Sequence, residues 1–86
     1  MDNRVDKIRR NSMYIVIELQ KLNDTQVANN VWAYSDQQGN VAESKYHDVL
    51  RAAAVSSIPV HSAVIVDEKG RTIKGPESYE HGVVSE

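Results

Sequence analysis

The sequence has no cysteine, only four glycines and two prolines, and no long apolar run. The missing cysteines exclude a disulfide framework, a thiolate zinc site and a cysteine nucleophile. The few glycines form no phosphate-cradling loop of the Walker or dinucleotide-binding type. No apolar stretch approaches the roughly 18 residues that span a bilayer, and no apolar segment precedes a cleavage site near the N-terminus. We therefore expect a protein that neither crosses a membrane nor is secreted.

What is present is a composition close to the globular average, with 41% hydrophobic and 26% charged residues in a chain of 86. A chain of this length folds as one domain and hides only about 60 to 65% of the surface that its unfolded form exposes. Because no disulfide or thiolate metal site supplements so small a core, we expect a homo-oligomer, in the simplest case a dimer.

Ten basic against twelve acidic residues give a net charge of −2, which argues against nucleic-acid binding through phosphate neutralisation. The charge is uneven, because residues 1–12 hold four basic side chains against Asp2 and Asp6. We interpret residues 1–12 as a charged, flexible leader, residues 13–81 as the domain and residues 82–86 as a tail. The alternative role for the leader is a nucleic-acid-binding arm, whose basic side chains are Arg4, Lys7, Arg9 and Arg10.

Alternating side chains predict two strands at the start of the domain. Residues 13–22, MYIVIELQKL, place apolar side chains on both sides of the first strand. The turn-forming residues NDT then lead into residues 26–35, QVANNVWAYS, which predict a second strand hairpinned to the first. Asparagine has poor strand propensity, so we expect a bulge or a late strand start near Asn30.

Residues 41–56 have the period of an amphipathic helix, for which Asn40 and Glu43 form an approximate capping box. The apolar stripe of this helix consists of Ala42, Tyr46, Val49, Leu50 and Ala53. Residues 60–67, VHSAVIVD, predict a third strand with apolar side chains on both faces. The turn DEKG, closing on a left-handed glycine, leads to a fourth strand, RTIKG, which a Gly-Pro pair interrupts before the edge segment ESYEH.

This order of elements predicts an α+β fold of one two-layer domain, strand-strand-helix-strand-strand, with one helix packed on a four-stranded, mainly antiparallel sheet. One helix covers one face only, and an apolar face left bare usually marks a partner surface. We expect self-association through the bare face, for which the candidate interface residues are Tyr14, Val16, Trp32, Tyr34, Ala63 and Ile65. In the alternative register Trp32 and Tyr34 face the helix, and Val27, Val31 and Ala33 face outward.

The sequence contains no arrangement typical of catalysis or metal binding. His47, His61 and His81 lack the spacing of a helical metal site, and we interpret them as surface residues. No Gly-x-Ser-x-Gly elbow occurs. Ser56 and Ser57 end the predicted helix, where serines are common, and Ser62 and Ser78 lie on strand-like segments with no base near them in the sequence. We therefore expect a protein that is not an enzyme and that has no metal and no cofactor.

Four segments of residues 13–81 carry a family resemblance: MYIVIELQ, VWAY, AESKYHDVLRAAAVSS and VHSAVIVDEKGRTIKGPESYEH. Their Tyr46-His47 pair, the alanines at 52–54 and the ESY ending resemble a group of small uncharacterised proteins from phages, prophages and other mobile elements of Gram-positive, often gut, bacteria.

The resemblance implies a mobile-element context, no established activity and no site residues to transfer. Such elements encode small virion parts and small inhibitors of host defence alike. Our hypothesis is a non-catalytic interaction protein whose partner is a second copy, a phage protein or a host protein, located in the bacterial cytoplasm or in the virion. The alternative is a nucleic-acid-binding accessory factor that uses the basic arm.

Overall fold

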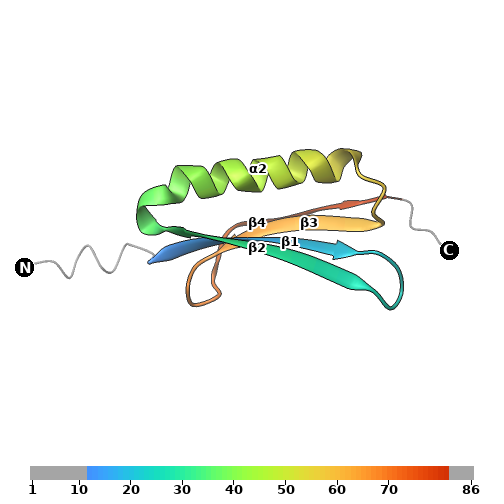
Figure 1. The fold of residues 1–86 in the computed structure, drawn as a ribbon, viewed down its shortest axis with the longest axis horizontal. Coiled ribbons are helices and arrows are strands. Elements are labelled where there is room, and N and C mark those ends of the chain that lie inside the picture. The colour runs from blue at the N-terminus through green and yellow to red at the C-terminus, as the bar shows by residue number, and fades with distance from the viewer. Residues whose placement is uncertain (1–11, 82–86) are drawn as a thin grey trace, which may run out of the picture.

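The segments with period-two and helical patterns fold into two layers, a sheet and a helix (Figure 1). In the computed structural model, which describes residues 12–81, the helix α2 (Gly39–Val55) lies across one face of a four-stranded sheet. The strands are β1 (Met13–Lys21), β2 (Val27–Ser35), β3 (Val60–Val66) and β4 (Thr72–Glu80), in the spatial order β2-β1-β3-β4. All neighbouring strands are antiparallel. The predicted fold class and element order are thus confirmed. Within residues 12–81, no helix is both long and apolar enough to cross a membrane.

The hairpin between β1 and β2 is regular along its whole length. Its pairing runs without interruption from Met13 opposite Ser35 to Lys21 opposite Val27. The predicted bulge or late strand start near Asn30 is therefore wrong, because β2 begins at Val27 and has no bulge. Asn30 lies directly opposite Glu18, and its side-chain amide donates a hydrogen bond of 2.8 Å to a Glu18 carboxylate oxygen. This cross-strand bond offsets the poor strand propensity of asparagine.

The turn between β3 and β4 has the predicted form. Gly70 adopts a φ of 80°, and its N–H donates to the carbonyl of Asp67 at 2.9 Å. Burial raises the pKa of the Asp67 carboxyl, but hydrogen bonds from Arg71 and from the Lys69 N–H outweigh it, so the pKa lies below its ordinary value. The predicted interruption at the Gly75-Pro76 pair is wrong, because β4 runs through it as one strand, with shifts of register between Ala63 and Val66 of β3.

The helix has the predicted phase but a different start. A capping box joins Ser35 and Gln38 across the 3-10 turn η1 (Asp36–Gln38), and α2 begins directly afterwards at Gly39. The predicted capping box at Asn40 is therefore wrong, because the chain already turns helical one residue earlier. The buried residues of the helix match the predicted stripe in full: Ala42, Tyr46, Val49, Leu50 and Ala53. In the core, this stripe packs on Val16, Ala63 and Ile65.

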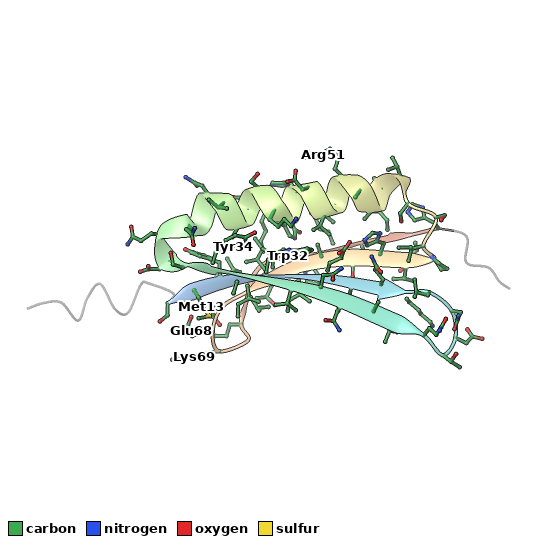
Figure 2. All side chains as sticks on the ribbon, in the orientation of Figure 1. Met13, Trp32, Tyr34, Arg51, Glu68 and Lys69 are labelled. Atoms are coloured by element: carbon green, nitrogen blue, oxygen red, sulfur yellow. The ribbon has the colours of Figure 1, made fainter. Side chains whose placement is uncertain are left out.

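The helix phase can be tested with two adjacent residues. Leu50 is 8% exposed in the core, whereas Arg51 points away from the sheet (Figure 2) and pairs with Asp48 on the surface. We expect Leu50→Ala to lower the free energy of unfolding by about 2 to 5 kcal/mol through the cavity it leaves. Arg51→Ala should change it by less than about 0.5 kcal/mol. Chemical denaturation measures both, and equal losses would contradict the phase.

The two left-handed glycines provide a second matched test. A side chain at Gly75, where φ is 85°, would place its Cβ 2.7 Å from the Tyr46 hydroxyl and 3.1 Å from the Ala63 carbonyl oxygen. At Gly70, φ is 80° but nothing lies within 4 Å of the same position. Gly70→Ala should cost about 1 to 2 kcal/mol for the backbone conformation alone. Gly75→Ala should cost about 1 to 3 kcal/mol more, because it also overpacks the core. Equal melting temperatures of the two variants would contradict this account.

Candidate functional site

The six predicted interface residues lie on the face of the sheet that α2 covers. Val16, Ala63 and Ile65 are buried in the core, and the half-buried rings of Tyr14, Trp32 and Tyr34 pack against it. Figure 2 shows Trp32 and Tyr34 on the helix side of the sheet. The candidate interface set is therefore corrected, and the alternative register is the one observed. The physical reason is that the long helix needs bulky side chains beneath it, and the aromatic rings of β2 fill the space beside Val16.

The opposite side of β2, β1 and β3 forms the open face, which α2 does not cover. Its cross-strand rows are Ala33–Ile15–Val66, Val31–Ile17–Val64 and Asn29–Leu19–Ser62, with Met13, Val27 and Val60 at the ends. Val31 is 56% and Val27 is 76% exposed, and Lys21, at the turn end, is the one charged side chain that these three strands place on this face. The open face is thus an apolar surface, and no other secondary-structure element of residues 12–81 lies over it.

Under the end of the helix, the structure brings together a polar cluster that sequence reasoning missed. His61 is only 3% exposed, so its prediction as a surface residue is wrong. Its Nε2 lies 2.5 Å from a carboxylate oxygen of Glu18 on β1, and its Nδ1 lies 3.0 Å from the Ser56 hydroxyl. The other Glu18 oxygen accepts the Asn30 bond from β2. The cluster therefore joins the end of α2 to three strands.

The hydrogen-bonding roles in this cluster follow from its partners. The Ile58 N–H donates to the Ser56 oxygen at 3.3 Å, and the same hydroxyl group lies within hydrogen-bond distance of Nδ1 of His61. Nε2–H of His61 donates to Glu18. Burial raises the pKa of the Glu18 carboxyl, but the hydrogen bonds from His61 and Asn30 outweigh it, so the pKa lies below its ordinary value. Glu18 is consequently an ionised acceptor at neutral pH.

A serine, a histidine and a carboxylate in a chain also resemble the order of a hydrolytic triad. Here, however, Ser56 closes the C-terminal end of α2, where the helix dipole is negative and disfavours an oxyanion. The Ser56 oxygen is also held by a backbone N–H. The cluster is better suited to holding the helix end on the sheet than to nucleophilic attack, and labelling of Ser56 by a fluorophosphonate would contradict this interpretation.

The other polar features of the described residues give weaker evidence for a functional site. Burial, together with the nearby Glu77 carboxylate, raises the pKa of Tyr46 to about 12, and its hydroxyl has no hydrogen-bond partner among the described residues. A hollow of about 360 Å³ between the start of α2 and β4 has Glu43 and Lys74 at its rim, and these pair at 3.2 Å, which leaves no net charge to select an ion.

Neither a metal site nor the basic arm can be assigned from this part of the chain. No group of three or more potential metal-ligating side chains converges within residues 12–81. His47 lies on the outer side of α2, and His81 bonds to the Ala53 carbonyl instead. The arm residues Arg4, Lys7, Arg9 and Arg10 lie outside the described residues.

The ionised state of Glu18 leads to a pH prediction. Because its pKa is lower in the folded than in the unfolded chain, its contribution to stability is present above the unfolded pKa, about 4.3, and is lost as the pH falls through the folded value. Glu18→Gln should be less stable than the wild type at neutral pH, and the difference should shrink below about pH 4. Denaturant titrations across this range measure it, with Asp48→Asn as a surface control, and a constant difference would contradict the assignment.

The arrangement therefore offers an apolar open face and, on the opposite side of the sheet, a buried polar cluster that fixes the helix. Both features stand on the geometry of this chain alone. Comparison with protein-family models, with curated proteins and with solved structures finds no match to the chain.

Proposed function

We propose that this chain is a non-catalytic interaction protein of a phage or another mobile element, and that it self-associates through its open face. The observation that carries the self-association is the apolar face of β2, β1 and β3, whose central row runs from the exposed Val31 through the half-buried Ile17 to the buried Val64. Large apolar surfaces on small domains mark interaction sites. The mobile-element origin is supported by the sequence resemblance.

A second copy of the chain suits the open face because the face is uncharged around its centre. In a two-fold contact each patch meets itself, so any charge at the centre would meet a like charge. Lys21 lies at the turn end, away from the central row of Val31, Ile17 and Val64. A hollow of about 400 Å³ at the same end, lined in part by Leu19, Val27 and Val60, gives the surface relief into which apolar side chains of a second copy can pack.

The size of the open face sets the strength of this contact. Three strands about 4.8 Å apart, of nine, nine and seven residues at roughly 3.3 Å each, present about 400 Å². Two such faces bury about 800 Å² together, less than the roughly 1,200 Å² at which stable interfaces begin. The face-to-face dimer is therefore weak and dissociates on dilution.

The central residue Ile17 provides the test. We expect light scattering of the full chain to show a mean mass above that of the monomer, which falls as the protein is diluted. Ile17→Glu would bury a charge between the two faces and should abolish the face-to-face contact, so that its mean mass stays below that of the wild type, because an unpaired buried charge is costly. Val55→Glu adds the same charge on the outer side of α2, where Val55 is 85% exposed, and should dimerise like the wild type.

Two further measurements complete this test. Ile17→Thr keeps the branched strand-forming side chain and should weaken the dimer to a smaller extent, and circular dichroism shows whether each variant remains folded. A wild-type chain that stays monomeric at every concentration, or an Ile17→Glu variant that reaches the same mean mass as Val55→Glu at every concentration, would contradict the proposal.

A further inference from the structure

The two edges of the sheet are built differently. At the β4 edge, the strand contains the Gly75-Pro76 pair, two shifts of register and the charges of Lys74, Glu77 and Glu80. These are features that prevent an edge strand from pairing with another chain. At the β2 edge, nine residues, VANNVWAYS, run in regular register with no charge, no proline and no bulge. The β2 edge therefore lacks the protection that the β4 edge has.

The main-chain groups that β2 presents to its edge can be identified from the hairpin. The Leu22 N–H donates to the Gln26 carbonyl at 2.9 Å, which makes this pair a hydrogen-bonded one. Bonded and non-bonded pairs alternate along an antiparallel ladder. The residues of β2 that do not bond to β1, and whose N–H and C=O groups therefore point outward, are Val27, Asn29, Val31, Ala33 and Ser35. Of these, Ser35 already donates its N–H to the Gln38 side chain.

We propose that the β2 edge pairs with the β2 edge of a second copy, antiparallel about a two-fold axis at Val31. Val31 is the midpoint of Val27–Ser35, and its own N–H and C=O point outward, so this register alone pairs all nine residues of both strands. An axis at Asn29 or Ala33 would pair only five.

The side chains complement themselves in this register. On the helix side, Trp32 lies opposite Asn30 of the second copy, and Tyr34 lies opposite Ala28 of the second copy. Large rings thus meet small residues rather than each other. On the other side, the row Val31–Ile17–Val64 continues without a break into the same row of the second copy. Trp32 and Tyr34 are half-buried, and the Lys45 ammonium, 4.2 Å from the Trp32 ring centroid, covers the ring from the helix side.

Cysteine cross-linking tests this register, because the chain has no cysteine of its own. In the proposed pair the two Cα atoms of residue 31 are about 5.5 Å apart, within the range of a disulfide. Full-length Val31→Cys, oxidised with diamide, should form a covalent dimer. Val55→Cys, equally free of structural constraint on the outer side of α2, reports random collisions and should stay largely monomeric.

A mixture of two variants defines the register. Asn29→Cys and Ala33→Cys should each remain monomeric when oxidised alone, because their symmetry mates are offset by four residues, about 13 Å. Mixed together, they should form a covalent heterodimer. A Val31→Cys variant that cross-links no more than Val55→Cys overturns the pairing, and a mixture that cross-links no more than its separate components overturns the register.

Hydrogen exchange of the wild-type chain gives a readout that needs no substitution. The outward amides of Asn29, Val31 and Ala33 should exchange slowly at high protein concentration and faster on dilution, whereas the β4 edge amides of Ser78 and Glu80 should exchange fast throughout. Fast exchange of the β2 amides at all concentrations would overturn the proposal. The edge pairing does not depend on the open face: Val31→Cys should still cross-link when combined with Ile17→Glu, so either proposal can fail without the other.

Discussion

The structure depends on a mismatch between one helix and a sheet that is apolar on both sides. The helix stripe covers Val16, Ala63 and Ile65 and leaves Val27, Val31 and, in part, Ile17 in contact with solvent on the other face. A domain with no disulfide and a single small core gains little from packing beyond that layer. The second apolar face is therefore a surface whose burial stabilises the chain only when another molecule supplies the cover, which couples folding stability to association.

The buried polar cluster restricts how the helix can lie on its face. An apolar stripe alone tolerates sliding along the sheet, because burial of apolar area has no direction. The bonds from Ser56 to His61 and from His61 to Glu18 are directional, and they fix the end of α2 over β3 and β1. Asn30 extends the same network to β2, the strand that carries the unprotected edge. The cluster is thus positioned to hold β2 in the plane of the sheet, where its outward N–H and C=O groups can be used.

The sequence was sufficient to predict the fold but not to predict which face of the sheet is exposed. The helical period predicted every buried residue of α2, and the turn chemistry predicted the left-handed Gly70, because both signals are local. The choice of face failed because residues 13–22 are apolar on both sides, so alternation could not show which side the helix covers. His61 was missed for a related reason. It shares a side with Ala63 and Ile65, which was a usable signal, but its contact with Glu18 depends on a register between strands 43 residues apart in the chain.

The difference between the two edges decides what kind of assembly this chain can build. If both edges were free, edge pairing would repeat and produce an open ribbon. Because Gly75, Pro76 and the charges of β4 block one edge, pairing through β2 ends at two chains. An edge-joined pair places its two open faces side by side and presents about 800 Å² of apolar surface, twice that of one chain. Two such pairs stacked face to face bury about 1,600 Å², the size of a stable interface, where single chains reach only half of it. If both proposed contacts form, the weak face contact and the closed edge contact together favour a four-chain assembly over either dimer alone.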